Sequence, residues 1–169
     1  MHPAGDRLVE VGVVNAAIHG LAERLLELKW MMATAESCTG GMIAAHCTDL
    51  AGSSAWFERG FVTYSNEAKT ELLGVPASLI LQDGAVSASV ASAMALGACY
   101  RSRAQVSVAV TGIAGPSGGS TEKPVGTVWL AWCVAGKVRT EMRLFTGDRA
   151  HVRQATTVAA LEGLLRLVP

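Results

Sequence analysis

The spacing of apolar residues along the chain changes between a helical period and a strand-like one. From Val9 to Leu28, apolar residues recur every three or four positions, with charged residues on the other face, which predicts an amphipathic helix. Asn66 and Ser87 are residue types that cap helices, so each is expected to begin one. In all, helices are expected at 9–28, 39–47, 66–74, 87–103 and 148–167.

Other segments have the apolar runs or the alternation that is typical of strands. Residues 30–35 and 105–110 are short apolar runs that predict buried strands, and residues 56–65 alternate across a strand. Residues 125–134 and 137–145 both alternate and are two residues apart, which predicts an antiparallel hairpin. Because strands and helices are interleaved, all 169 residues are predicted to form a single domain, a three-layer α/β/α sandwich around one mixed sheet.

The composition argues against several classes of protein. Hydrophobic residues make up 50% of the chain and charged residues 17%, which excludes a disordered chain. The 14 basic and 14 acidic side chains balance without a charge run, so neither nucleic acid nor an anionic membrane is an expected partner. No apolar stretch is long enough for a membrane span, and the first residues lack the pattern of a signal peptide.

The cysteines have neither metal-ligand nor redox spacing. Cys38, Cys47, Cys99 and Cys133 lie far apart, without a CxxC pair or a histidine at ligand spacing, so no metal site is expected. A domain of this size does not need disulfides for its stability, and free thiols are typical of a reducing compartment. The sequence therefore predicts a cytoplasmic protein.

Three loops that follow predicted strands carry the candidate chemistry. They span residues 36–41, 64–69 and 111–119. Ligands gather at the carboxyl ends of strands in an open α/β sheet, so the loops would converge if their strands are parallel neighbours. Glu36 is not expected to act as a paired general acid, because Glu67 is the only second carboxylate in the other two loops.

The first loop brings two hydroxyl groups and a thiol to the expected start of a helix. Ser37, Cys38 and Thr39 directly precede Gly40 and Gly41. Free N–H groups at a helix N-terminus favour an oxyanion or a phosphate, which makes the loop a candidate catalytic or anion-binding site. In the alternative interpretation, a hydroxyl only caps the helix and the glycines only turn the chain.

The residues leave the nucleophile and its base open. Cys38 is intrinsically the better nucleophile, but a thiol needs a partner such as histidine, and the four histidines lie outside the three loops. A serine with Lys69 as its base remains. As a base near neutral pH, Lys69 needs a pKa lowered from about 10.4 to ~7.5, which requires burial or nearby positive charge. Alternatively, Tyr64 relays the proton beside a charged Lys69, or Lys69 is an ordinary solvated lysine.

The third loop is rich in glycine. Gly112, Gly115, Gly118 and Gly119 allow the backbone to wrap closely around a ligand and to form an anion-binding nest. The loop lacks the GKS or GKT of a P-loop. Its length in a compact domain favours a functional role over a plain connection.

Two arginines and two aromatic residues have both a functional and a structural interpretation. Arg149 and Arg153 lie one turn apart on the last predicted helix, where they could pair with a phosphate or be part of a solvated helix start. Trp56 and Phe57 are expected in the core or in an interface rather than as a platform for stacking bases.

Several motifs, in order along nearly the whole chain, resemble one family. AESCTGG at 35–41, TYSNEAK at 63–69, VTGIAGP at 110–116 and TGDR at 146–149 are similar to the CinA carboxy-terminal domain family. Its enzymatic members are nicotinamide mononucleotide amidohydrolases of the PncC type. The resemblance implies hydrolysis of the carboxamide of nicotinamide mononucleotide to nicotinate mononucleotide and ammonia, without a metal ion or a cofactor, by a homo-oligomer.

The resemblance also implies roles for individual residues. Ser37 resembles the nucleophile, Tyr64 and Lys69 the residues that activate it and move its proton, and Thr111 a hydroxyl that contributes to the site. The residues expected to contact the substrate are small or positively charged and lie within the same motifs: Thr39, Gly40, Gly41, Gly112, Gly115, Gly118, Gly119 and Arg149.

Chemistry at the first loop agrees with this assignment. An oxyanion formed by attack of Ser37 is expected to accept from the amides near Gly40 and Gly41. Two other hypotheses stay open at this point. One is a catalytically inactive nucleotide-binding or regulatory module, and the other is a thiol amidase with Cys38 as its nucleophile.

Overall fold

A mixed sheet of five strands forms the middle of the molecule. The computed structural model describes residues 4–169, with side chains from residue 12 onward. Strand β1 (Met32–Glu36) pairs in parallel with β2 (Phe57–Val62) and with β3 (Val106–Gly112). Strand β4 (Thr127–Val134) runs antiparallel to β3 and to β5 (Lys137–Leu144), which confirms the predicted hairpin. The strand order is β2-β1-β3-β4-β5.

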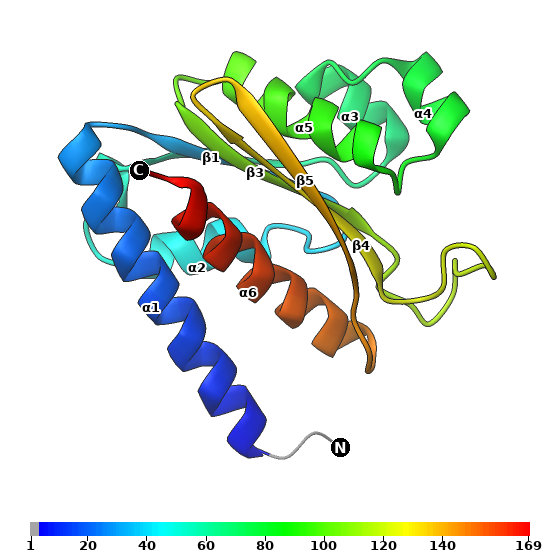
Figure 1. Ribbon diagram of the computed structural model, residues 1–169, viewed down its shortest axis with the longest axis horizontal. Helices are drawn as coiled ribbons and strands as arrows, with labels where there is room; N and C mark the ends of the chain where they lie inside the picture. The colour runs from blue at the N-terminus through cyan, green and yellow to red at the C-terminus, as the bar shows by residue number, and fades with distance from the viewer. Residues whose placement is uncertain (1–3) are drawn as a thin grey trace.

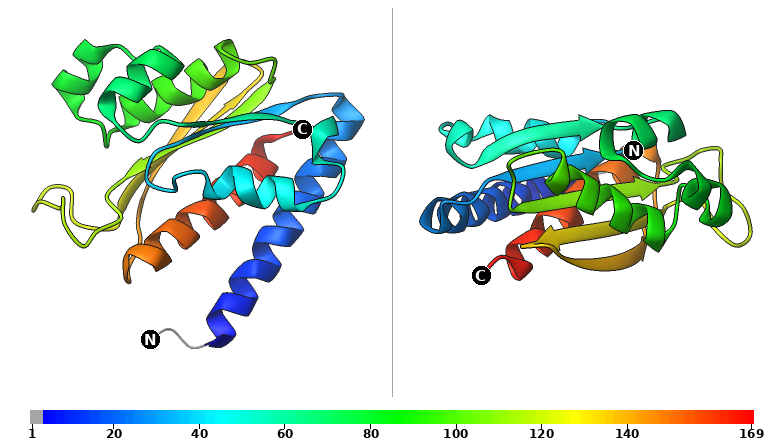
Figure 2. Two further views of the ribbon diagram at one scale, coloured as in Figure 1. Left: turned by 180° about the vertical axis from the view of Figure 1, so that it is seen from behind. Right: turned by 90° about the horizontal axis from the view of Figure 1, so that it is seen from above.

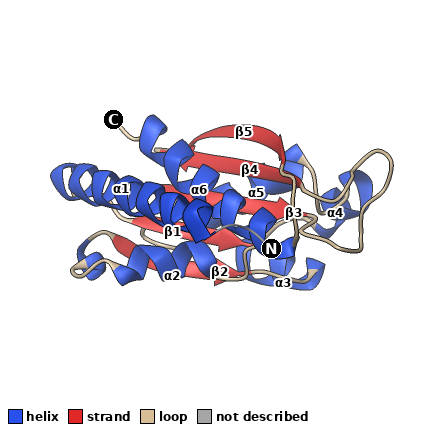
Figure 3. Cartoon of the chain, turned by 90° about the horizontal axis from the view of Figure 1, so that it is seen from below, coloured by secondary structure: helices blue, strands red, loops and turns tan. Residues whose placement is uncertain are grey.

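Helices cover both faces of this sheet (Figures 1 and 3). One face carries α1 (Ala4–Leu28), α2 (Met42–Asp49) and α6 (Arg149–Leu167). The other carries α3 (Asn66–Leu73), α4 (Ala77–Asp83) and α5 (Ala88–Tyr100). A 3-10 turn at Ser53–Ala55 lies between α2 and β2. The predicted three-layer α/β/α sandwich around one mixed sheet is confirmed.

Alternation along the strands divides the interior into two cores. Val106, Val108 and Val110 of β3 are buried in the core beneath α1 and α6, whereas Ala109 is buried in the core beneath α5. Trp56 is fully buried in the first core, as predicted, and Phe57 packs against it. The second core is lined by small side chains from three strands, which let α5 approach the sheet closely: Ala33, Ala35, Ala109 and Ala131.

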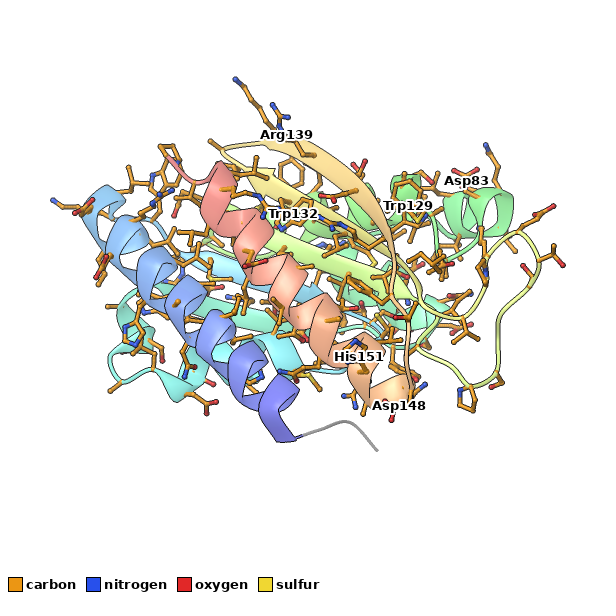
Figure 4. The ribbon with its side chains drawn as sticks, turned by 60° about the horizontal axis from the view of Figure 1, so that its bottom comes forward. Asp83, Trp129, Trp132, Arg139, Asp148 and His151 are labelled. Atoms are coloured by element: carbon orange, nitrogen blue, oxygen red, sulfur yellow. The ribbon has the colours of Figure 1, made fainter. Side chains whose placement is uncertain are left out.

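Two helices meet their neighbours at glycines. A Cβ at Gly97 of α5 would lie 2.1 Å from Leu73 O of α3. A Cβ at Gly163 of α6 would lie 2.2 Å from the ring of Trp132, whose Nε1 donates to Ala160 O over 2.8 Å. Figure 4 shows Trp132 between α6 and the sheet. Any side chain larger than hydrogen would push α5 away from α3 at Gly97 and α6 away from the sheet at Gly163.

The first and last helices lie side by side (Figures 1 and 2). Arg24 of α1 donates to the carbonyl oxygens of Leu165 and Val168 over 2.7 and 2.8 Å. Leu21 and Leu25 are buried, as the helical period predicted, while the side chain of Val9 is outside the described part. Within the described residues, no helix has the length and hydropathy needed to cross a membrane.

The predicted elements differ from the structure mainly at their ends. Helix α2 begins at Met42 rather than near Thr39, because Gly40 and Gly41 have φ values of 61° and 98°. Strand β2 ends at Val62, and the chain then turns into α3.

Ser65, not Asn66, is the N-cap of α3, since its side chain accepts from Ala68 N. Helix α5 ends at Tyr100, before the predicted end at Arg103. Helix α4 was not predicted, because Ile80 is its one buried residue and a single apolar contact leaves no helical period to detect.

Candidate active site

The three candidate loops meet at one edge of the sheet. Strands β2, β1 and β3 are parallel neighbours, so their carboxyl ends lie together. Backbone hydrogen bonds join the chain just beyond the strands: Ser37 N donates to Val110 O over 3.1 Å, and Thr63 N to Glu36 O over 2.8 Å. The predicted convergence is confirmed.

Lys69 of α3 contacts the hydroxyl group of Ser37. Its Nζ lies 3.1 Å from Ser37 Oγ, 3.0 Å from Thr63 O and 3.3 Å from Tyr64 O. Both side chains are buried, with 1% of Lys69 and 8% of Ser37 exposed. Lys69 is therefore not the solvated lysine of the alternative interpretation.

Burial lowers the pKa of Lys69 below its ordinary value, because a low-dielectric environment disfavours the charged form. A neutral amine has two hydrogens and one lone pair. Lys69 Nζ lies within hydrogen-bond distance of the carbonyl oxygens of Thr63, Tyr64 and Ser65 and of Ser37 Oγ, so a neutral amine that donates to two of the carbonyl groups keeps its lone pair for the proton of Ser37. The geometry thus fits a serine with a lysine base.

Tyr64 lies beside this pair but is not joined to it through its phenol. The side chain is 62% exposed, and its Oη accepts from Arg149 over 3.0 Å. In the part of the chain that the structure describes, no hydrogen bond links this Oη to Ser37 or Lys69. Of the two proton paths that the sequence left open, the geometry favours the direct one through Lys69.

Cys38 is buried, and its surroundings do not favour a nucleophilic thiolate. Burial raises the pKa of its thiol to about 11, and the nearby Glu36 acts in the same direction. The thiol is therefore protonated at neutral pH, which argues against the thiol amidase. No cluster of three metal-ligating side chains occurs among the described residues.

Glu36 is fully buried at the end of β1, directly before Ser37. One carboxylate oxygen accepts from Thr39 Oγ1 over 2.6 Å, from Gly41 N over 3.0 Å and from Ile43 N over 3.1 Å. The other accepts from Ala44 N over 2.9 Å. The N-terminus of α2 is thus already occupied by a carboxylate of the protein itself.

This arrangement corrects the expected oxyanion donors. Gly41 N donates to Glu36, and Gly40 N donates to Ser37 O over 3.1 Å, so neither amide is directed at a substrate. Among the described residues, no oxygen atom accepts from the amides of Cys38 and Thr39, the next two along the chain from Ser37. These two amides are the donors that remain near the nucleophile.

Sequence reasoning missed the role of Glu36. The lack of a second carboxylate argues against a general acid, but the partners of Glu36 in the structure are three backbone amides and the hydroxyl group of Thr39. The detectable signal was an acidic residue shortly before glycines and an expected helix start, where free N–H groups attract a negative charge.

The two arginines on α6 reach across to the loops. Arg149 donates to Gly115 O over 2.8 Å as well as to Tyr64 Oη. Arg153 donates to Cys38 O over 3.1 Å and to Thr39 O over 2.8 Å. Both therefore contact loops of the site, and Arg149 is exposed at the start of the helix while Arg153 is half-buried.

The start of α6 is itself capped. Asp148 Oδ1 accepts from His151 N over 2.8 Å, and Figure 4 shows these two residues together at the first turn. This capped end fixes the position from which Arg149 and Arg153 extend.

Thr111 and the glycine-rich loop form the third side of the site. Thr111 is 1% exposed, and its Oγ1 donates to Ala85 O over 2.8 Å. A Cβ at Gly112 would lie 2.6 Å from Val128, and one at Gly115 would lie 2.5 Å from Val125. These two positions need glycine because they pack against the chain at the start of β4. The close approach of a ligand, which the sequence suggested as the reason, is not required to explain them.

The same explanation extends to Gly119, where a Cβ would lie 2.8 Å from Val125 N. Gly118 has no such close contact, its nearest neighbour being Ile113 at 3.6 Å. Its φ of 90° still favours glycine.

Comparison with known proteins shows which family the chain resembles. Residues 15–168 match the model of the CinA C-terminal domain. A nicotinamide-nucleotide amidohydrolase PncC of Pseudomonas putida is 56% identical over 87% of this chain and 92% of its own length. The protein of the same name from Escherichia coli K12 is 57% identical over 78% of this chain and 80% of its own.

One further relative is longer than this chain, and the crystal structure of another is known. A CinA-like protein of Akkermansia muciniphila is 58% identical over 96% of this chain, which corresponds to 37% of that protein. The crystal structure of the competence/damage inducible protein CihA from Agrobacterium tumefaciens is 49% identical, with a TM-score of 0.88 over 92% of this chain and 95% of that one. From the matched residues, the shared fold and this level of identity, it follows that the chain belongs to the CinA C-terminal domain family.

Proposed function

We propose that this protein hydrolyses the carboxamide of nicotinamide mononucleotide to nicotinate mononucleotide and ammonia. Relatives named nicotinamide-nucleotide amidohydrolase, 56–57% identical over most of the chain, support this substrate and reaction. The observation that carries the proposal is the buried contact of 3.1 Å between Lys69 Nζ and Ser37 Oγ. A nucleophile that needs an activating base is here next to a base whose pKa is lowered.

In the first half of the reaction, Lys69 takes the proton of Ser37 as Oγ attacks the carboxamide carbon. A C–O bond forms, and the electron pair of the carbonyl moves onto its oxygen. The C–N bond then breaks, and the proton on Lys69 passes to the leaving nitrogen, which departs as ammonia. The pyridinium ring withdraws electrons from the amide carbon, so a serine and a lysine suffice without a full triad.

In the second half, water hydrolyses the acyl-enzyme. Lys69, neutral again, accepts a proton from the attacking water, and a new C–O bond forms. The bond to Ser37 Oγ breaks, and the proton returns from Lys69 to the serine. Nicotinate mononucleotide leaves, and the enzyme is restored.

The developing oxyanion accepts hydrogen bonds from the amides of Cys38 and Thr39. Donors aimed at such a position each stabilise the transition state by about 2.7–4 kcal/mol.

Tyr64 and Arg149 border the site at its exposed side and contact the nucleotide, because both are accessible and Arg149 carries the positive charge that a phosphate requires.

We also expect a homo-oligomer. Light scattering on the purified protein gives its molar mass and hence the number of subunits.

The test is ammonia release from nicotinamide mononucleotide in the presence of a chelator, with the product identified by mass spectrometry. The wild-type protein is expected to turn over, and Ser37→Ala to lose at least about 10³-fold in kcat. Calorimetric binding of the mononucleotide by the wild-type protein without product would instead support an inactive binding module. Loss of turnover in Cys38→Ala with an unchanged rate in Ser37→Ala would assign the reaction to the thiol.

A further inference from the structure

The carboxylate of Glu36 is an internal anion that organises the segment carrying the nucleophile. It is 0% exposed, and its four hydrogen bonds come from the loop and from the first turn of α2. No lysine or arginine among the described residues forms an ion pair with it. Its negative charge is thus balanced by backbone dipoles and by one hydroxyl group.

Glu36 and Ser37 face opposite layers although they are adjacent in the chain. The Glu36 carboxylate contacts Ile43 N and Ala44 N of α2, whereas Ser37 Oγ contacts Lys69 of α3 on the other face of the sheet. Whatever fixes the Glu36 side chain therefore also fixes the direction in which the next residue presents its hydroxyl group.

The same carboxylate holds the second half of the loop. Its Oε2 accepts from both Thr39 Oγ1 and Gly41 N. Arg153 adds two hydrogen bonds to the carbonyl groups of Cys38 and Thr39. With its carbonyl groups and its glycine amides engaged, the loop keeps the amides of Cys38 and Thr39 as a pair from which no oxygen atom among the described residues accepts.

From these contacts we infer that Glu36 is a positioning residue, which sets Ser37 against Lys69 and presents the amides of Cys38 and Thr39 to the oxyanion. It touches neither substrate nor reacting atoms. The inference rests on the proposed function for its kinetic consequence, but the orientation of Ser37 has a consequence that does not depend on the natural substrate.

Replacement by glutamine tests this directly. Glutamine has the same shape as glutamate, but its side chain has only one oxygen acceptor. Its NH₂ group would face backbone N–H groups, which are donors as well. For the mononucleotide, kcat is expected to fall by about 10²-fold, as for a misplacement of about 1 Å, with KM within threefold of the wild type. The midpoint of the pH–rate profile should stay unchanged, because Lys69 remains the base.

Thr34→Val is the matched control. Thr34 lies two residues earlier on β1, is equally buried, and its hydroxyl has no hydrogen-bond partner among the described residues. Its kcat should match the wild type within twofold. Thermal unfolding of each variant gives the folded fraction at the assay temperature, so that rates are compared per folded molecule.

If Glu36→Gln does not fold, Thr39→Val provides a milder test, since it removes the hydroxyl donor alone. Its kcat is then expected to fall about tenfold with KM unchanged. A rate per folded molecule equal to the wild type, in whichever of the two variants folds, would reduce Glu36 to a structural role and overturn the inference. Loss of one limb of the pH–rate profile in Glu36→Gln would make Glu36 an acid or base and overturn it as well.

A second readout separates this inference from the proposed function. Labelling of Ser37 by a fluorophosphonate, followed by mass spectrometry, reports the reactivity of the serine without the mononucleotide. Labelling at least tenfold slower in the Glu36 variant than in Thr34→Val supports the inference even if the wild type does not hydrolyse the mononucleotide. Equal labelling rates in the two variants contradict it, whatever the natural substrate is.

Discussion

At the scale of single residues, the candidate site depends on where two buried charged groups find their partners. Lys69 and Glu36 are both essentially inaccessible, yet neither forms a salt bridge among the described residues. Lys69 is surrounded by carbonyl oxygens and a hydroxyl group, which tolerate a neutral amine. Glu36 is surrounded by N–H groups, which require an acceptor. Opposite surroundings thus agree with the chemical role proposed for Lys69 and the positioning role inferred for Glu36.

The lowered pKa of Lys69 predicts the pH dependence of the reaction. In the proposed mechanism the neutral amine is the base, so kcat/KM should rise with pH through the pKa of Lys69 and level off above it. Lys69→Met should lose about 10²–10⁴-fold and show no such rise. A pH–rate profile of both proteins measures this, and a wild-type rate that falls as pH rises from 6 to 9 would contradict a lysine base.

The same pKa has a consequence for stability. Between the lowered pKa of Lys69 and its ordinary value of about 10.4, the unfolded chain binds a proton that the folded protein does not. The free energy of unfolding therefore gains a contribution that increases with pH in this range. Urea titrations at several pH values should show this increase in the wild type and a smaller one in Lys69→Met.

Tyr64→Phe distinguishes the two proton paths. The phenol contacts Arg149 and not Ser37 or Lys69, so its removal should raise KM a few-fold and leave at least about a tenth of kcat. Steady-state kinetics beside Lys69→Met provide the comparison. Equal losses of kcat in both variants would show that the phenol takes part in the proton transfer.

At the scale of elements, the position of α3 is set by its contact with α5. Lys69 lies on α3, and Leu73 of the same helix lies against Gly97 of α5. Small residues on α5 and on the strands beneath it allow this close approach. A helix that carries little apolar surface of its own is thereby held at the depth that Lys69 needs to reach Ser37.

Gly97→Ala should disturb this contact. Its Cβ would be 2.1 Å from a backbone carbonyl oxygen, so α3 and α5 must separate, at a cost of about 1–3 kcal/mol in the free energy of unfolding. Since α3 carries Lys69, kcat should fall as well. Gly12→Ala is the matched control: beyond its own helix backbone and chain neighbours, no atom of the described residues lies within 4 Å of the added Cβ, and alanine should stabilise α1 by up to about 1 kcal/mol. Equal melting temperatures of the two variants would contradict the predicted clash.

At the scale of the whole molecule, the C-terminal ends of α1 and α6 meet away from the loops of the site (Figure 1). Arg24 joins the end of α1 to the end of α6, whereas the N-cap at the other end of α6 lies beside Arg149. The contact of Arg24 contributes to stability, and the proposed chemistry lies at the carboxyl ends of the strands.

Arg24→Met tests this separation. It retains most of the apolar stem but loses both hydrogen bonds, one of them exposed, so the free energy of unfolding should fall by about 1 kcal/mol. Kinetic constants for the mononucleotide should remain within twofold of the wild type at a temperature where both are folded. A large loss of kcat in this variant would show that this contact between α1 and α6 and the site are linked.

Periodicity, cap residues and the two-residue hairpin connection were sufficient to predict most elements and the layered fold, because these depend on neighbours within a few positions. The motifs of the family resemblance pointed to Ser37, Tyr64, Lys69 and Thr111, and the structure places Lys69 in the first turn of α3 and Thr111 at the end of β3 rather than in loops. Helix α4 and the ends of α2 and β2 were not predicted, because they depend on backbone angles and packing that apolar spacing does not encode.

The amino-acid sequence thus determined the kinds of elements, their order and the chemical groups at the strand ends. Tertiary structure decided which groups meet. Lys69 reaches Ser37 across a separation of 32 residues because β1 and β2 are parallel neighbours, and Glu36 turns from that pair to α2 because successive side chains of a strand point to opposite faces. Burial then lowers the pKa of the one group and engages the other with backbone amides, and neither effect exists until the layers have packed.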